Sequence, residues 1–291
     1  MSSDDYNSAS DIDDSIPTNA NSSAGNKRKH TAGTEQPSDK LQQQVDINKL
    51  YKKKQKIHEL KQRTKTKHKY DYELRDTDLI KLPPNQQCEL YWKLYVYNMV
   101  QHKLQLSSIE QQNTLTTSNV VKLNINESHT LDKLNKLIKT QLFADYKSTL
   151  CSSVQSSIVH HSPYIVYICS NALRCVEVVR SLYTLGLHKS MIVKLFSKHI
   201  KIEEQIQLLD NDIRIVCGTP NRIHKLIDNN SLQLDRCRYI VCDMQRDSKN
   251  YTLFTLPDVS HEYFILYQKY LHELIMKPNN NNPHTTKLMF Y

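Results

Sequence analysis

The stretch Ile213–Ile223 has the sequence Ile-Arg-Ile-Val-Cys-Gly-Thr-Pro-Asn-Arg-Ile and decides the fold. Its first half is a short apolar run rich in β-branched residues, which is typical of a strand buried on both faces of a parallel sheet. The Gly-Thr-Pro that follows predicts a turn and then a helix, because Thr219 suits the N-cap and Pro220 the first helical position. A second such run, Tyr239–Cys242, ends directly before Asp243. Strands of this kind around a helix predict βαβ units.

The chain from about residue 119 onward alternates apolar runs with helical periods. We predict strands at Val120–Ile125, Ile165–Cys169, Met191–Phe196, Ile213–Cys217, Tyr239–Cys242 and Lys287–Tyr291. The intervening helices are expected at 131–143, 173–182, 202–209, 220–227 and 263–274. The expected fold over residues 119–291 is therefore α/β, a single parallel sheet flanked by helices.

A helical lead-in is expected between the tail and this domain, at residues 85–118. Pro83-Pro84 marks its boundary, and apolar residues at helical spacing predict an amphipathic helix over Glu89–Leu104. The Gln-, Thr- and Ser-rich residues 107–118 are expected to form a loop.

The net charge of +9 comes from one local block. Between Lys49 and Lys69 there are ten lysines and arginines against one acid, Glu59, so the remaining charges cancel. Residues 1–80 are otherwise polar, and we expect a disordered tail with a basic arm at 49–69. The arm is typical of a nucleic-acid patch, a nuclear import signal or both; a merely solvated charged helix is the plain alternative. The candidate RNA-binding residues of the arm are Lys52, Lys53, Lys54, Lys65 and Lys67.

Several classes of function find no support in the sequence. No secretory signal is visible, and no apolar run approaches the length of a membrane span, so no membrane partner is expected. The seven cysteines form no Cys-x-x-Cys pair, and we expect free thiols in a reducing compartment rather than a metal site or disulfides. No Ser/His/Asp, Cys/His or paired-carboxylate pattern predicts hydrolase chemistry.

The order of the predicted strands and helices resembles that of the first RecA-like domain of DEAD-box RNA helicases. Within that superfamily the chain is similar to the Cms-type family, subunits of the 90S pre-ribosomal complex. Two segments carry this closer likeness, Lys194–Lys201 and Gly218–Ile223. The first has the sequence Lys-Leu-Phe-Ser-Lys-His-Ile-Lys. The likeness covers roughly residues 120–291 and implies a degenerate helicase-like RecA domain.

Thr219-Pro220-Asn221-Arg222 corresponds to the helicase segment Thr-Pro-Gly-Arg, which touches the RNA backbone in those enzymes. The resemblance therefore implies RNA contacts by Thr219 and Arg222, and the free N–H groups of a helix N-terminus suit a phosphate. The alternative is that Thr-Pro only caps a helix and Arg222 pairs with a local acid. Lys198 and His199, in the family-like stretch, are further candidates for phosphate contact.

The groups that split a nucleotide are missing from the corresponding positions. The helicase Asp-Glu-Ala-Asp corresponds to residues 243–246, where Met244 replaces the glutamate that orients the attacking water. Asp243 alone is expected to end its strand as a cap. The counterpart of the phosphate loop, Asn124–Thr130, has neither glycine nor lysine. No catalytic residue, no cofactor and no bound nucleotide are expected.

The sequence thus predicts a non-catalytic factor of ribosome biogenesis. The resemblance implies pre-ribosomal RNA and other proteins of the 90S particle (the small-subunit processome) as partners, pre-rRNA processing as the process, and the nucleus and nucleolus as location. Two alternatives stay open: an ATP-dependent helicase-like enzyme that needs a partner domain, and a pure protein scaffold whose basic arm only directs import.

Overall fold

The computed structural model describes residues 55–56, 77–106, 111–112, 114–124, 126–151, 161–277 and 285–291. The chain divides into two compact units, Met1–Gln62 and Arg63–Tyr291. The described part of the first unit is a two-residue helical fragment, residues 55–56. The disordered tail and the basic arm fall almost wholly outside the described residues, so these predictions stay open.

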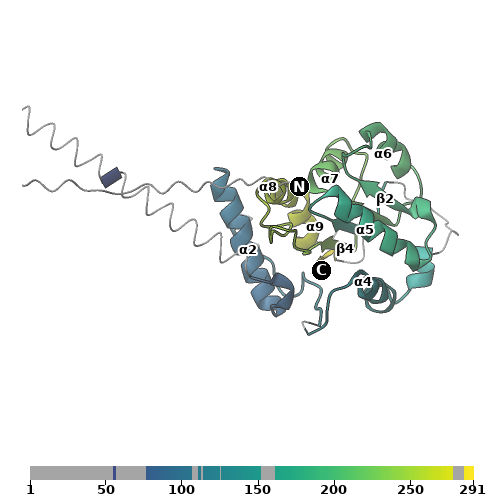
Figure 1. Cartoon of the computed structure of the whole chain (residues 1–291), viewed down its shortest axis with the longest axis horizontal. Helices are drawn as coiled ribbons and strands as arrows, with labels where there is room; N and C mark the ends of the chain where they lie inside the picture. Colours follow the sequence, from purple (N-terminus) through teal and green to yellow (C-terminus); the bar gives the residue numbers. More distant parts are fainter. Residues whose placement is uncertain are drawn as a thin grey trace, which may run out of the picture. The chain divides into compact units, whose positions relative to one another are not determined.

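A five-stranded parallel sheet forms the centre of the second unit (Figure 1). The strand order is β2-β3-β1-β4-β5, and the strands are β1 (Ile165–Ile168), β2 (Ile192–Leu195), β3 (Ile215–Gly218), β4 (Tyr239–Cys242) and β5 (Lys287–Phe290). All are short and mainly apolar, as a sheet covered on both faces requires, and their two lysines, Lys194 and Lys287, are half-buried. The predicted α/β class is confirmed, and β4 has the predicted bounds.

One predicted strand is wrong. In place of a strand at Val120–Ile125, Val120 makes an isolated parallel bridge to Leu288 of β5, and residues 121–124 continue without regular structure; Ile125 lies outside the described residues. The reason is local. The Asn124 side chain accepts a hydrogen bond from the Asn126 backbone N–H at 3.1 Å, a turn that competes with a sheet ladder.

One face of the sheet packs against α4 (Leu131–Leu137), its π-helical continuation η2 (Ile138–Leu142) and α5 (Ala172–Leu182) (Figure 1). The π turns η3 (Lys147–Cys151) and the 3₁₀ turns η4 (Tyr183–Leu185) and η5 (Lys189–Met191) lie in the connections around this face. Side chains at alternate strand positions, such as Ile165, Tyr167 and Val241, point into this layer.

The opposite face packs against the remaining helices. They are α2 (Pro84–Gln101), α6 (Ile202–Leu209), α7 (Pro220–Asp228), α8 (Pro257–Leu266), η6 (Tyr267–Leu271) and α9 (His272–Met276), and the 3₁₀ turn η1 (Leu79–Lys81) precedes them. The helix α2 begins earlier than predicted, because Pro84 occupies its first position instead of blocking it. The predicted helix 202–209 is confirmed as α6.

Aromatic residues fill the layer beneath α2. The Tyr91 ring of α2 contacts Phe254, Tyr267 and Phe290 at centroid distances of 5.4, 5.2 and 5.6 Å. Its hydroxyl lies 3.0 Å from that of Tyr263 in α8. The lead-in helix therefore shares one core with the sheet. The predicted division into 1–80, 85–118 and 119–291 stays a prediction.

Candidate binding site at the carboxyl edge of the sheet

The carboxyl ends of the three central strands lie side by side. Ile168 pairs with Gly218 on one side and with Cys242 on the other, so the next residues, Thr219 and Asp243, emerge at the same edge. Parallel α/β sheets bind their ligands at this edge, where the loops leave the strands.

Gly218 is required by a close approach between strands. A Cβ at this position would lie 2.4 Å from the Leu195 carbonyl oxygen and 2.7 Å from the Leu195 Cβ of β2. The next residue, Thr219, donates its backbone N–H to the same carbonyl at 2.9 Å. The Gly-Thr dipeptide therefore fixes the direction in which α7 leaves the sheet.

Thr219 is the N-cap of α7 and Pro220 its first residue, as predicted. The Thr219 side chain makes no capping hydrogen bond within this helix, which the structure describes in full. Because the residue is half-buried, its hydroxyl remains a group that a ligand at the sheet edge could engage. Its RNA-binding role stays a prediction.

Arg222 lies inside the molecule. Its side chain is buried, and its Nη1 donates to Gln205 Oε1 at 2.7 Å. Gln205 in turn donates to the carbonyl oxygens of Lys194 and Phe196, both at 3.0 Å. The network ties α7 to α6 and to the end of β2, so this guanidinium is committed to a neutral amide rather than to an acid. Contact between Arg222 and RNA stays a prediction that would require this network to open.

Lys198 and His199 occupy the turn after β2, and both side chains are exposed. His199 adopts a left-handed conformation with φ 64°. The turn places a cation and an imidazole at the surface, where a phosphate could reach them. The arm residues Lys52, Lys53, Lys54, Lys65 and Lys67 lie outside the described residues.

Asp243 is fully buried and held by two groups that sequence reasoning missed. Arg174, from the first turns of α5, donates Nε to both carboxylate oxygens at 3.2 and 3.1 Å and Nη2 to Oδ1 at 3.1 Å. The Tyr167 hydroxyl donates to Oδ1 at 3.0 Å. Burial raises the pKa of Asp243 above its ordinary value, and the Arg174 guanidinium opposes that shift. Asp243, expected to cap the end of its strand, thus forms an ion pair that joins the end of β4 to α5.

This ion pair bears on metal chemistry at the sheet edge. A magnesium ion needs carboxylate oxygens that are free to coordinate it. Both oxygens of Asp243 already accept hydrogen bonds from a cation, and Met244 beside it is an apolar, buried side chain. The arrangement suits structural anchoring better than metal binding.

Tyr291 closes the neighbouring part of the edge. Its hydroxyl donates to the Thr130 carbonyl at 2.6 Å, and its ring meets the His129 ring edge-on at 5.0 Å. Its backbone carbonyl accepts from the Met244 N–H at 2.6 Å. Tyr291 therefore links the loop 126–130 to the residue after Asp243.

The loop that corresponds to a phosphate loop uses its polar groups internally. Asn124 Nδ2 donates to Glu127 Oε1 at 3.1 Å, and Thr130 caps α4 by accepting from the Lys133 N–H. Lys133 Nζ donates to Ser128 Oγ at 3.1 Å. A negatively charged Glu127 at this place would repel a phosphate.

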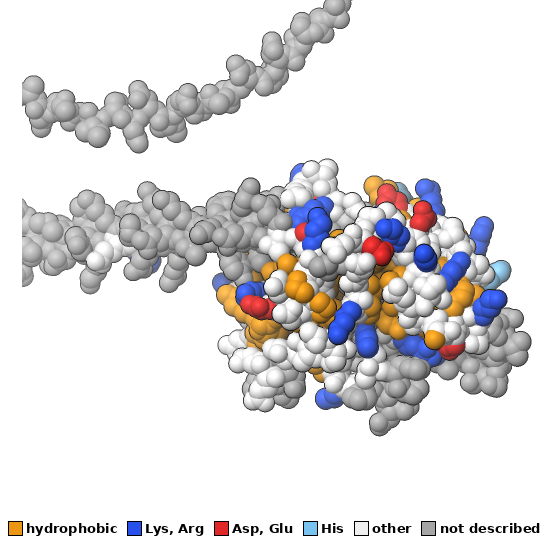
Figure 2. Space-filling view, turned by 90° about the horizontal axis from the view of Figure 1, so that it is seen from below, with side chains coloured by type: hydrophobic (Ala, Val, Ile, Leu, Met, Phe, Trp, Pro, Cys, Tyr) orange, Lys and Arg blue, Asp and Glu red, His pale blue; other side chains and the backbone are white. Residues whose placement is uncertain are grey.

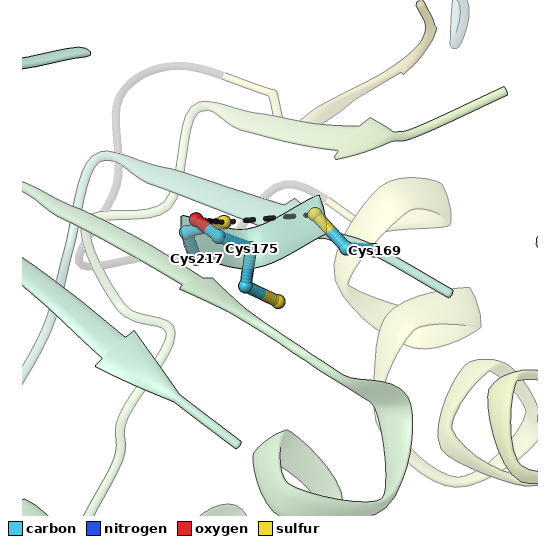
Figure 3. A group of neighbouring side chains, drawn as sticks. All are labelled: Cys169, Cys175 and Cys217. Atoms are coloured by element: carbon cyan, nitrogen blue, oxygen red, sulfur yellow. Dashed lines mark hydrogen bonds between the residues drawn. The ribbon is translucent and has the colours of Figure 1, made fainter. Parts of the chain in front are cut away.

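Three buried cysteines lie together beneath the same edge: Cys169 after β1, Cys175 in α5 and Cys217 in β3 (Figure 3). Burial raises the pKa of the Cys169 and Cys217 thiols, whereas their hydrogen bonds to Cys175 lower the pKa of that thiol. Their positions in sequence gave no signal, because Cys169 and Cys217 are 48 positions apart and come into contact only when β1 and β3 pair. The expectation of no metal site stays a prediction.

Within the described residues, no helix combines the length and apolar character that crossing a bilayer requires.

The fold and the site define a parallel α/β domain whose sheet edge is closed by an arginine–aspartate pair and by Tyr291. A family model described as "CMS1: U3-containing 90S pre-ribosomal complex subunit" matches residues 20–291. The chain belongs to this family, and the resemblance found in the sequence is confirmed.

Individual relatives match a smaller part of the chain. The similarity to Protein CMSS1 of Xenopus laevis is 33% identity over 129 residues, 42% of this chain and 46% of that protein. For Protein CMSS1 of Homo sapiens it is 31% over 133 residues, 44% and 47% respectively. For Protein cms1 of Schizosaccharomyces pombe it is 30% over 115 residues, 39% and 41%. The matched region thus spans less than half the length of these relatives.

The solved structures that match the chain include DEAD-box proteins. A DEAD-box protein of Methanococcus jannaschii matches with a TM-score of 0.32 and 18% identity, over 44% of this chain and 30% of that one. Dbp5 of S. cerevisiae, solved with RNA and ADP BeF3, matches with a TM-score of 0.34 and 12% identity, over 68% and 43%.

Proposed function

We propose that this chain is a non-catalytic, RNA- and protein-binding subunit of the nucleolar 90S pre-ribosome, active in small-subunit biogenesis. Membership of the CMS1 family, which covers residues 20–291, is the observation that carries the proposal. The partners would be pre-ribosomal RNA and other proteins of the particle, and the location would be the nucleolus.

The sheet edge supports a non-catalytic role. Asp243 is engaged by Arg174 and Tyr167, and its neighbour Met244 can neither accept a proton nor orient a water. The segment 124–130 lacks the glycines and lysine that wrap a triphosphate. An ATPase that used this sheet edge would need a general base, a free metal-binding carboxylate and a phosphate-binding loop from another protein.

The basic arm at 49–69 supports RNA binding through phosphates. Its ten cations account for the net charge of the chain. On the face of the folded unit seen in Figure 2, lysine and arginine side chains are dispersed and acidic and hydrophobic side chains lie between them. We therefore assign the non-specific RNA affinity to the arm and the positioning of the chain to the folded unit.

A salt titration of RNA binding tests this assignment. Replacing Lys52, Lys53 and Lys54 by Ala should weaken binding to single-stranded RNA and reduce the log–log salt slope by about two, since each lost phosphate contact removes about 0.7. The matched control replaces three exposed lysines of the folded unit, Lys133, Lys136 and Lys225. An equal loss in both variants, or no change in the arm variant, would contradict the assignment.

Two further measurements separate the alternatives. A nucleotide titration of the full chain should show no binding of ATP–magnesium in the low micromolar range; such binding would support a helicase-like enzyme. Crosslinking inside the isolated particle should join the arm to pre-ribosomal RNA. Crosslinks confined to proteins would support a scaffold.

A further inference from the structure

The three cysteines beneath the sheet edge form a compact group of sulfur atoms. The Sγ atoms of Cys169, Cys175 and Cys217 all lie within 4.8 Å of one another, and those of Cys169 and Cys217 are 3.6 Å apart (Figure 3). Each comes from a different place in the chain: the residue after β1, the helix α5, and the strand β3. The helix and the strand hold Cys175 and Cys217, and the Cys169 N–H is fixed by a hydrogen bond to the Gly218 carbonyl at 2.9 Å.

The spacing fits a shared ion better than a disulfide. Three sulfurs bound at about 2.3 Å to one ion lie about 3.5 Å apart when the ion is pyramidal, as trivalent arsenic is, and about 4 Å apart when it is planar. The Cys169–Cys217 separation of 3.6 Å is close to the pyramidal value, and the two separations to Cys175, within 4.8 Å, leave room for it. A disulfide requires about 2.05 Å between the two sulfurs. The sulfurs of Cys169 and Cys217 would therefore have to move closer together by more than they would to share one ion.

We propose that Cys169, Cys175 and Cys217 form a three-sulfur site for a soft, thiophilic ion that accepts three ligands. An all-sulfur ligand set selects soft ions over magnesium or calcium. In the part of the chain that the structure describes, the group has three members, whereas a closed zinc site takes four ligands. The site thus favours three-coordinate chemistry.

Burial decides the charge of the preferred ion. All three cysteines are fully buried within an apolar cluster that also contains Val178 and Val241. A net charge is costly in such surroundings. Three thiolates around a trivalent ion leave no net charge, as trivalent arsenic illustrates: As(OH)₃ + 3 RSH → As(SR)₃ + 3 H₂O. The reaction needs no oxidant, and each thiol proton leaves with a hydroxide as water.

Access to the site runs through the start of α5. The residues between Cys169 and Cys175 lie at the surface, where Asn171 and Leu173 are exposed. Opening the first turn of this helix would uncover Cys175 and admit a small neutral species without unfolding the sheet.

Intact-mass spectrometry of the full chain, kept reduced with a phosphine, tests the site with arsenite as the probe. One arsenic should bind per chain, and Cys169→Ser, Cys175→Ser and Cys217→Ser should each weaken binding at least tenfold. The matched controls Cys237→Ser and Cys242→Ser, also buried, should bind like the parent. Absence of arsenic from the parent, or equal binding by all five variants, would overturn the proposal.

A second measurement avoids variants that fail to fold. In the unmodified chain, arsenite should protect Cys169, Cys175 and Cys217 from alkylation in mild denaturant, while Cys237 and Cys242 react at their usual rates. Protection of a different set of cysteines would overturn the assignment. Zinc serves as the comparison ion: tighter binding of zinc than of arsenite at these residues would overturn the three-coordinate chemistry.

Discussion

At the scale of single residues, breaking the ion pair between Arg174 and Asp243 should destabilise the fold strongly. Asp243 is fully buried and Arg174 supplies its compensating charge. Arg174→Ala would leave a buried carboxylate with the Tyr167 hydroxyl as its remaining named donor. We expect a loss of about 2–4 kcal/mol in the free energy of unfolding, somewhat below the range for a fully buried pair because Arg174 is partly exposed.

Urea denaturation measures this loss, with Arg180→Ala as the control, since Arg180 is an exposed arginine of the same helix. In an Asp243→Asn background, Arg174→Ala should cost less, because no buried charge is left behind. Equal costs in the two backgrounds would show that the pair is not coupled.

Two glycines are needed for different reasons, and substitutions can tell them apart. A Cβ on Gly218 would meet the Leu195 backbone oxygen at 2.4 Å, whereas one on Gly186 would meet nothing within 4 Å. Gly186 instead has φ +81°, a conformation that asparagine tolerates better than alanine. Gly218→Ala should cost about 1–3 kcal/mol through overpacking.

At Gly186, Asn should be better tolerated than Ala; at Gly218, Asn should be at least as harmful as Ala. Thermal unfolding of the four variants checks both orders. If Asn is better tolerated than Ala at both positions, the positive φ and the close backbone contact are not separate causes at Gly186 and Gly218.

Sequence patterns located some of these residues but not their partners. The Gly-Thr-Pro signal placed Thr219 and Pro220 correctly, because capping preferences act over a few neighbouring residues. Arg174 and Asp243 are 69 positions apart, and no periodicity connects them. The burial of Arg222 was likewise hidden, since it depends on Gln205 of another helix.

At the scale of elements, apolar runs predicted the five strands because a sheet covered on both faces needs apolar side chains at most positions. The segment 120–125 failed because Asn124 forms a local turn. The π-helical segments η2, η3 and η6 have no sequence signal in the helical period, so a continuous helix was expected where η2 and η6 occur.

The two helix starts at the sheet edge differ in a testable way. Asn171 caps α5 by accepting from the Arg174 N–H at 3.0 Å, whereas Thr219 makes no such bond in α7. Asn171→Ala should cost about 1 kcal/mol of stability, and Thr219→Ala should cost clearly less. Chemical denaturation compares the two. If Thr219→Ala leaves stability intact but weakens RNA binding, its hydroxyl acts on the ligand; an equal stability loss would assign it to the fold.

At the scale of the whole molecule, the lead-in helix α2 packs into the same core as one face of the sheet. Tyr91, Tyr95 and Met99 are fully buried, and Tyr91 contacts aromatic side chains of α8, η6 and β5. The sequence placed this helix in a separate segment because its amphipathic pattern shows that one face is buried but not against which element. The structure supplies that partner.

Two truncations follow from this packing. A fragment of residues 63–291, which retains the whole second unit, should unfold cooperatively near the melting temperature of the full chain. A fragment of residues 119–291 lacks α2 and would expose Phe254, Phe264 and Tyr267, whose rings pack against its tyrosines. Burying one large aromatic side chain stabilises a fold by about 1.5–3 kcal/mol. Exposing several of them would therefore remove a large part of a domain's free energy of unfolding, which is about 5–15 kcal/mol. We expect the shorter fragment to bind a hydrophobic dye and to lack a sharp thermal transition; cooperative unfolding of residues 119–291 alone would show instead that α2 is a separable attachment.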